Sequence, residues 1–425
     1  MPGIVPPAND AHRIEADYLI ETALPLAAAA DAIAGEQSSG TFVPVPGETP
    51  ELKQRSAARV ERLTAIGEVD EPSLPGATSP AGVRPARALF TLSWPLENLG
   101  ASLPNLLATV AGNLFELKQV SGLRLLDLRL PIAFAERYAG PGFGIGGTRD
   151  LTGVHGRPLI GTIINPSVGL SAEQTAELVG VLADAGIDFV KDDELQADGT
   201  YCPFEARVRA VMRVVNRNAD RTGKKVMVAF NLTGEIDEMR RRHDLVRDLG
   251  GSCVMVSLNS VGLAGVIELR RHAELPIHGH RNGWGYLSRH PLLGWSYVAW
   301  QKIWRLAGVD HLHVNGLRSK FSEDDDSVIA SARACLTPMF ADKPCVVMPV
   351  FSSGQTALQA PDTFRALGST DLIYAAGGGI MAHRDGPAAG VRSLREAWGA
   401  ATQGIALSEH ARTHPALAAA LGKPS

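Results

Sequence analysis

Four consecutive charged residues follow an apolar, strand-length run in the middle of the chain: Lys191, Asp192, Asp193 and Glu194. Side chains alternate along a strand, so Lys191 and Asp193 are expected on one side and Asp192 on the other, with Glu194 at the turn. Two carboxylates suit a hard divalent ion such as Mg2+. The lysine would repel that ion unless its neutral amine has reacted with CO2 to give a carbamate. A solvated charged turn is the competing interpretation.

Polar or glycine residues also follow other apolar runs in the second half of the chain. Arg281 offers the fork that binds phosphate, and it follows two histidines in His278-Gly-His280. The run Gly377-Gly-Gly379 supplies backbone amides for an anion, although such a run is also common in simple turns. His278 is equally well explained as a hydrogen-bonded core residue. The other polar or glycine residues at run ends are Asn165, Asn231, His313, Ser352, Ser353 and Gly354.

The elements that must position these residues recur regularly after residue 158. Continuous apolar runs separated by amphipathic helical patterns predict a parallel sheet covered on both faces, and eight such units predict a (β/α)8 TIM barrel. One helix, 171–185, opens with a capping box of Ser171 and Gln174. A doubly wound sheet stays open, because a strand count does not prove closure. In a barrel the polar residues would meet at one rim. The runs are 159–164, 187–190, 226–230, 253–258, 276–278, 311–314, 345–351 and 372–376.

The first part of the chain predicts a small α+β domain of ferredoxin-like type. Its β-type stretches are 14–21 and 88–94, and its helical segments are 24–34 and 103–111. The Pro- and Gly-rich residues 71–85 predict a loop, and the glycine-dense residues 139–147 predict a linker or ordered loop rather than a dinucleotide fingerprint. We therefore divide this α/β chain into an N-terminal domain, 1–148, and a barrel with a C-terminal helical tail, 149–425.

Composition excludes several classes of protein. The 425 residues are 45% hydrophobic and 20% charged with a net charge of −4, which indicates a globular protein that binds no nucleic acid. The apolar stretch 23–34 is too short to span a membrane and has no basic segment before it. Four cysteines without a CxxC pair favour reduced, buried thiols in a cytoplasmic protein: Cys202, Cys253, Cys335 and Cys345.

Eight motifs in order, over roughly residues 14–400, resemble the ribulose bisphosphate carboxylase large subunit. The spacing of KDDE, His313 and Lys320 is the most specific part of this resemblance. The motifs are GEQSSGTF (35–42), GNLF (112–115), GTIINPSVGLS (161–171), DFVKDDE (188–194), HGHR (278–281), DHLHVNGLRSK (310–320), PVFSSG (349–354) and AAGGGIMAH (375–383).

The resemblance implies roles for individual residues. Lys191 would be carbamylated by CO2 and would hold Mg2+ together with Asp193 and Glu194. His280 would contact substrate hydroxyls, and Lys320 would lie on a mobile loop where the family's lysine polarises CO2. One phosphate would bind Arg281, His313 and Ser352, and a second anion site would use Gly354, Gly377 and Gly378. Glu36 and Asn113 would reach the active site of a neighbouring subunit, so an obligate homodimer, or a higher oligomer built from it, is expected.

Departures from the family pattern imply a different reaction. Asn165 and Ser167 stand where the carboxylases have lysines, one of which transfers a proton, and Phe42 replaces a tryptophan. The chain therefore looks like a ribulose bisphosphate carboxylase-like protein, the form IV branch, without CO2 fixation. An enolate-forming enzyme acting on a phosphorylated sugar or sugar acid is expected.

The retained Lys320 favours one reaction of that branch. A cation that attracts CO2 during carboxylation would also stabilise a carboxylate leaving as CO2, which favours decarboxylation of a 3-oxo sugar-acid phosphate such as 3-oxo-isoapionate 4-phosphate. Lys320 could instead pair with the acidic residues 323–326. The alternatives are an isomerase or enolase acting on a methylthio-pentulose phosphate of methionine salvage, and a non-catalytic binding protein.

Overall fold

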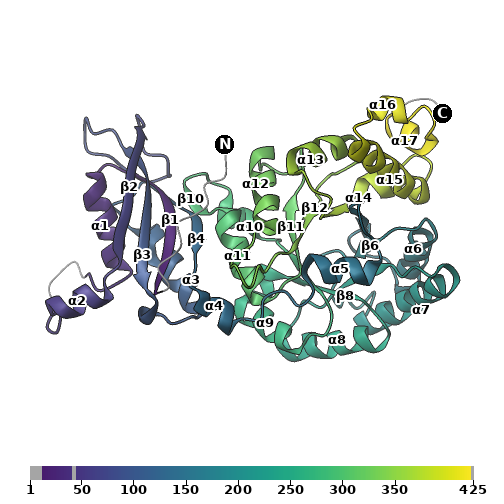
Figure 1. Cartoon of the computed structure of the whole chain (residues 1–425), viewed down its shortest axis with the longest axis horizontal. Helices are drawn as coiled ribbons and strands as arrows, with labels where there is room; N and C mark the ends of the chain where they lie inside the picture. Colours follow the sequence, from purple (N-terminus) through teal and green to yellow (C-terminus); the bar gives the residue numbers. More distant parts are fainter. Residues whose placement is uncertain (1–11, 41–44, 423–425) are drawn as a thin grey trace. The chain divides into compact units, whose positions relative to one another are not determined.

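The computed structural model describes residues 12–40 and 45–422. The chain forms two compact units (Figure 1). One contains the described residues up to Tyr138 together with Gly283–Leu306, and the other contains Ala139–Asn282 and the described residues from Ala307 onward. The boundary expected between residues 148 and 149 falls inside helix α5 (Gly144–Thr152). The division into domains 1–148 and 149–425 stays a prediction.

A five-stranded sheet organises the first unit, in the order β10-β4-β1-β3-β2. Its central strand, β1, buries Ile14, Ala16, Tyr18 and Ile20, which is the alternation expected of a strand with one face in the core. The strands are β1 (Arg13–Thr22), β2 (Arg59–Glu68), β3 (Ala86–Pro95), β4 (Gly122–Arg129) and β10 (Leu293–Trp295). The helices are α1 (Leu26–Glu36), α2 (Pro50–Ser56), α3 (Leu103–Ala111), α4 (Ile132–Arg137), α10 (Trp284–Ser288) and α11 (Tyr297–Ala307), whose last residue belongs to the second unit.

The α+β prediction for this unit is confirmed, but three of its strands were missed. Strand β2 is largely exposed, so it has no apolar alternation to reveal it. Strand β10 is only three residues long and joins the sheet parallel to β4 from a distant part of the chain. The predicted loop 71–85 contains no helix or strand.

The second unit is a closed barrel of eight parallel strands, as predicted. Strand β13 pairs with β5 and strand β9 pairs with β11, and this closure excludes the doubly wound alternative. All eight predicted runs overlap a strand, with ends that differ by a few residues. The strands are β5 (Leu159–Ile163), β6 (Phe189–Lys191), β7 (Met227–Asn231), β8 (Cys253–Ser257), β9 (Ile277–His280), β11 (His311–Asn315), β12 (Met348–Phe351) and β13 (Ile373–Ala375).

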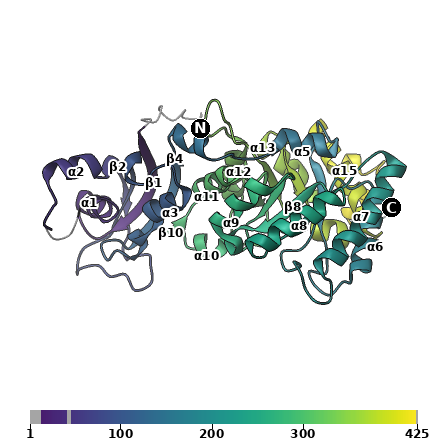
Figure 2. The same cartoon turned by 90° about the horizontal axis from the view of Figure 1, so that it is seen from below.

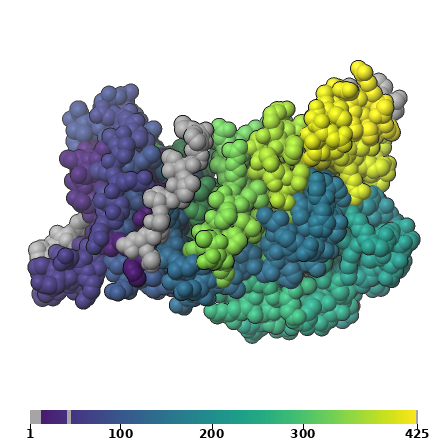
Figure 3. Space-filling view, viewed as in Figure 1, coloured from purple at the N-terminus to yellow at the C-terminus, as the bar shows by residue number. Residues whose placement is uncertain are grey.

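Helices surround the barrel. Consecutive helices α6 to α9 lie side by side around its outside (Figures 1 and 2), and the last three helices pack together as one compact mass (Figure 3). The capping box of α6 is confirmed by bonds in both directions between Ser171 and Gln174. The helices are α6 (Ala172–Asp184), α7 (Phe204–Thr222), α8 (Ile236–Asp248), α9 (Leu258–His272), α12 (Asp325–Leu336), α13 (Ala360–Leu367), α14 (Gly377–Met381), α15 (Pro387–Gln403), α16 (Leu407–His410) and α17 (Pro415–Ala420).

The glycine-dense segment before the barrel corrects one expectation. Residues 144–147 are the first turn of α5 rather than a linker. The Asp310 carboxylate accepts hydrogen bonds from the backbone N–H groups of Phe143 (2.6 Å) and Gly144 (2.8 Å), and so satisfies donors that a helix start leaves unpaired. Among the described residues, none of the helices has the length and apolar character needed to cross a bilayer.

Candidate active site

Lys191 ends strand β6 and points into the barrel, where its side chain is almost completely buried. Its Nζ donates to the backbone carbonyl of Asp192 (2.7 Å) and lies 3.4 Å from Oε2 of Glu194. Burial lowers the pKa of Lys191, and the charges of Glu194 and Asp193 oppose that shift only in part. A lysine with a lowered pKa has more of its amine in the neutral form, which is the form that reacts with CO2.

Asp192 points away from Lys191, as the alternation predicted. Its Oδ2 accepts hydrogen bonds from Nε and Nη2 of Arg207 on helix α7, at 3.2 and 3.1 Å, and from the backbone N–H of Asn231 at 2.9 Å. The pair is dry, with Arg207 0% and Asp192 2% exposed. Sequence reasoning missed Arg207, because a cation within a polar helix has no local pattern that marks a buried partner.

The two candidate carboxylate ligands lie on the turn after β6. Asp193 Oδ1 accepts a hydrogen bond from the backbone N–H of Leu195 at 3.0 Å. Glu194 Oε2 lies 3.4 Å from both Lys191 Nζ and His280 Nε2. The Asn231 amide donates to the carbonyls of Asp193 and Glu194, at 3.2 and 3.3 Å, and holds the turn in place. These oxygen donors next to a buried amine fit a hard divalent cation and a carbamate.

His280 ends strand β9 beside this turn. Burial and then the charge of Lys191 lower its pKa to about 4, although Glu194 opposes the shift. His280 is therefore neutral at neutral pH, and it can donate or accept a proton at the nitrogen that faces Glu194.

Arg281, His313 and Ser352 come from three neighbouring strand ends. His313 Nδ1 lies 3.0 Å from Ser352 Oγ. Arg281 Nη2 donates to Oε2 of Glu323 at 2.6 Å, so an anion that binds Arg281 must compete with that carboxylate. This ion pair was not predicted, because Glu323 lies within an acidic run where no single residue stands out.

Lys320 lies on the loop between β11 and α12 with its side chain exposed. Its backbone N–H donates to the carbonyl of Ser353 (3.3 Å), and its Nζ lies 5.3 Å from the ring centre of Phe321. Within the described part of the chain, the structure shows no ion pair between Lys320 and the acidic run that follows it.

The candidate glycines lie beside other predicted site residues. A Cβ at Gly377 would come 3.4 Å from Asn165 Nδ2, so these two residues adjoin, and a Cβ at Gly378 would meet open space. Gly354 has φ +85° and lies near the backbone nitrogen of Lys320. The rim therefore has an unobstructed stretch of backbone where a ligand can approach closely.

Glu36 and Asn113 belong to the first unit. Glu36 ends helix α1 half-buried, and the exposed Asn113 begins a 3-10 turn, Asn113–Glu116. Phe42 lies outside the described residues.

Two other places have features of a site. His243, Asp244 and His272 are close enough together to hold a metal ion. However, His243 Nε2 accepts a hydrogen bond from the Glu274 N–H (3.0 Å) and Arg247 lies 3.3 Å from Asp244, so hydrogen bonds and a cation already occupy this cluster.

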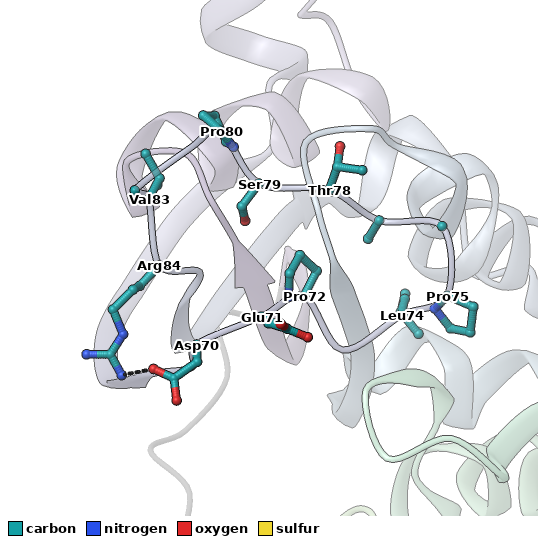
Figure 4. A pocket seen from close by; sticks show the side chains of 13 residues that line it. Asp70, Glu71, Pro72, Leu74, Pro75, Thr78, Ser79, Pro80, Val83 and Arg84 are labelled. Atoms are coloured by element: carbon teal, nitrogen blue, oxygen red, sulfur yellow. Dashed lines mark ion pairs between the residues drawn. The ribbon is translucent and has the colours of Figure 1, made fainter.

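In the first unit, residues of the 70–84 loop line an open hollow of about 660 Å³ with an Asp70–Arg84 ion pair at its edge (Figure 4). Most of its other lining residues are proline, glycine or small residues, and its one arginine is already paired with Asp70.

A closed parallel barrel with a buried lysine, carboxylates, imidazoles and an arginine at its carboxyl-terminal rim defines a barrel enzyme. Residues 144–423 match the catalytic domain of the ribulose bisphosphate carboxylase large chain, and residues 14–134 match its N-terminal domain. The chain belongs to the ribulose bisphosphate carboxylase large-chain family.

Similar proteins span nearly the whole chain. The 3-oxo-isoapionate-4-phosphate transcarboxylase/hydrolase of Xanthobacter autotrophicus is 62% identical over 96% of this chain and 99% of its own length. The 3-oxo-isoapionate-4-phosphate decarboxylase of Rhizobium rhizogenes is 45% identical over 96% of this chain and 97% of its own length. A rubisco-like protein from Burkholderia fungorum, known from its crystal structure, is 50% identical. The match covers 97% of this chain and 99% of that chain, with a TM-score of 0.91. A dimeric archaeal Rubisco from Hyperthermus butylicus is 32% identical over 98% and 96%, with a TM-score of 0.83.

Proposed function

We propose that this chain is an enzyme that decarboxylates a 3-oxo sugar-acid phosphate of the 3-oxo-isoapionate 4-phosphate type. The similarity to relatives named for that substrate, 62% and 45% identical, carries the proposal. It also favours this reaction over the methylthio-pentulose isomerase and over a non-catalytic protein. In the reaction the bond between the carboxylate carbon and its neighbour breaks and CO2 leaves. The electron pair stays on the substrate, delocalised into the 3-oxo group, and the resulting enolate takes up a proton.

The proposed cofactor is Mg2+, held by Asp193, Glu194 and a carbamate on Lys191. The chemistry of the donor set supports this choice, because the lowered pKa of Lys191 favours the neutral amine and the carboxylates are hard oxygen ligands. Bound there, Mg2+ would act as a Lewis acid towards a substrate oxygen.

The other residues of the rim have separate proposed tasks. The Lys320 cation stabilises the departing carboxylate, and neutral His280 contacts the substrate hydroxyls beside Glu194. Asn165 cannot titrate, so the final proton comes from water or another group.

The phosphate is placed near Arg281, His313 and Ser352. Gly354, Gly377 and Gly378 form the second anion site, where the backbone is open.

Transfer or hydrolysis is a second candidate, because the relative that is 62% identical is named transcarboxylase/hydrolase. Substrate labelled with 13C in its carboxylate distinguishes the two. With enzyme and Mg2+, decarboxylation releases the label as CO2 and bicarbonate, whereas transfer or hydrolysis leaves it in an organic acid. Label that stays on an isomer with a moved carbonyl would refute both.

A cytoplasmic homodimer with shared sites completes the proposal, with Glu36 and Asn113 serving the neighbouring subunit. A Lys191→Ala subunit and an Asn113→Ala subunit should each be inactive alone. Mixed after dissociation and reassociation, they should regain part of the activity, because one of the two sites in a heterodimer contains both native residues. No recovery, with a heterodimer shown to form, would mean that Asn113 serves its own subunit rather than the neighbouring one, and full activity of Asn113→Ala alone would place Asn113 outside the site.

A further inference from the structure

The barrel interior differs between its two sides. Below rim residues such as Lys191, strands β12, β13 and β5 to β8 fill it with apolar side chains such as Met255, Val350 and Ile373. Strands β9 and β11 contribute three buried imidazoles instead, from His278, His311 and His313, exposed by only 0%, 0% and 4%. Polar groups in such a core persist only when they are hydrogen-bonded, so their partners determine what they do.

These imidazoles form one continuous hydrogen-bonded chain, here called the imidazole chain. It runs from Thr148 Oγ1 to His311 Nε2 (2.8 Å), from His311 Nδ1 to His278 Nδ1 (3.3 Å), and from His278 Nε2 to His313 Nε2 (2.7 Å). It ends with His313 Nδ1 and Ser352 Oγ, 3.0 Å apart. Its first member lies on helix α5 and its last at the proposed phosphate site.

The direction of every bond in the chain follows from its first member. The Thr148 hydroxyl donates to the carbonyl of Gly144 at 2.5 Å, and a carbonyl can only accept. Thr148 Oγ1 must therefore accept from His311 Nε2–H. Burial keeps the His311 ring neutral with this one proton, which leaves its Nδ1 to accept from His278 Nδ1–H. His278 Nε2 must then accept from His313 Nε2–H.

Each imidazole in this order carries a single proton. Burial lowers the pKa of all three histidines, that of His311 to about 3, which agrees with three neutral rings. Nδ1 of His313 is consequently an acceptor, and the hydroxyl hydrogen of Ser352 points to it.

We infer that Thr148, His311 and His278 are positioning residues that fix the tautomer of His313 and thereby turn the Ser352 hydroxyl hydrogen away from the bound phosphate. The part of this inference that concerns phosphate rests on the proposed function. In this arrangement His313 is a neutral acceptor rather than a cationic ligand, and Arg281 supplies the positive charge. A change at the far end of the chain should therefore alter the phosphate site without touching it.

Thr148→Val is the decisive variant, because it removes the acceptor of His311 Nε2–H with little change of volume. His311 Nε2–H would then be a buried donor without a partner, and reversing the other three bonds replaces it with a lone pair, which is tolerated better when buried. In the reversed chain His313 carries its proton on Nδ1 and releases the Ser352 hydroxyl. Thr148→Ser keeps the acceptor. Thr152→Val is the matched control, since Thr152 lies on the same helix and its hydroxyl donates only to backbone carbonyls of Thr148 and Arg149.

The tautomer of His313 is read from nitrogen shifts and two-bond proton correlations in 15N-histidine-labelled protein, assigned with His313→Gln. Inorganic phosphate affinity is measured by calorimetry. We expect Nε2–H in the wild type, Thr148→Ser and Thr152→Val, and Nδ1–H in Thr148→Val. The latter should also bind phosphate about two- to tenfold more tightly, the effect of one hydrogen bond regained.

Nδ1–H or a doubly protonated ring on wild-type His313 would overturn the inference, and this result does not depend on any variant folding. An unchanged His313 tautomer in folded Thr148→Val would also overturn it. Neither measurement uses turnover. A protein that shows the expected tautomers but leaves labelled 3-oxo acid intact would refute the proposed function alone.

Discussion

Replacing Arg207 with methionine should be among the most destabilising single changes in the barrel. The Asp192 carboxylate would keep only the Asn231 N–H of its three hydrogen bonds, in a pair now 0% and 2% exposed. Arg207 also donates to the carbonyls of Cys202 and Ala197, at 3.1 and 2.8 Å, which would lose that donor. Leaving one partner of a buried ion pair alone typically costs about 3–5 kcal/mol.

The assay is unfolding in urea, followed by circular dichroism, for the wild type and two variants. Arg209→Met is the matched control, because Arg209 lies on the same helix and pairs with Glu205 at the surface, where such a bond is worth about 0.3–0.5 kcal/mol. The unfolding midpoint of Arg207→Met should fall well below that of Arg209→Met. If the free energy of unfolding of Arg207→Met fell by less than about 1 kcal/mol, a buried Asp192 carboxylate without its arginine would not be costly, and the prediction would be refuted.

Three further outcomes are expected. Burial raises the pKa of Asp188, but Arg157 and Lys224 outweigh it and hold that pKa below its ordinary 3.8. Asp188→Asn should therefore cost unfolding free energy at pH 7, and its gap to the wild type should close as pH falls below about 4; a gap constant with pH would contradict the linkage. Lys320→Ala should lower the rate of CO2 release about 100-fold or more with unchanged stability, whereas Arg318→Ala on the same loop should not; unchanged turnover in Lys320→Ala would contradict its proposed role. Chelation should abolish turnover and Mg2+ restore it in the wild type, and 13C-bicarbonate should give a carbamate signal that Lys191→Ala lacks; a signal present in both would place the carbamate elsewhere.

The barrel was predictable because its strands are buried on both faces. A strand such as β7 is apolar throughout, and a continuous apolar run is visible in the sequence without knowledge of its neighbours. Strand β2 is exposed along most of its length and has no regular apolar pattern. Its pairing with β3 could therefore not be predicted from the sequence. The first turn of α5 was missed for a related reason: Asp310, far along the chain, binds its first N–H groups.

Part of the candidate site was predictable, because the position of a residue along a strand determines the side of the sheet to which its side chain points. Alternation placed Lys191 and Asp192 on opposite sides, and the structure shows the two side chains with separate partners. Alternation did not predict that Asp192 pairs with Arg207 or that Arg281 pairs with Glu323, because Arg207 and Glu323 approach from other elements. Thr148 was invisible for the same reason, since only the closed barrel brings it to His311.

The two ends of the barrel hold their charges differently, and this difference indicates which end does chemistry. Asp188 and Asp310 each precede a strand, and each accepts a backbone N–H of a neighbouring strand as well as an arginine. Their hydrogen-bonding capacity is used within the fold, as expected of residues that stabilise the amino-terminal face. At the opposite rim Glu194 has only 3.4 Å contacts to Lys191 and His280, with the lysine's pKa lowered by burial. A cation and a substrate can bind charges that the fold leaves loosely paired, and this supports placing the proposed reaction at this rim.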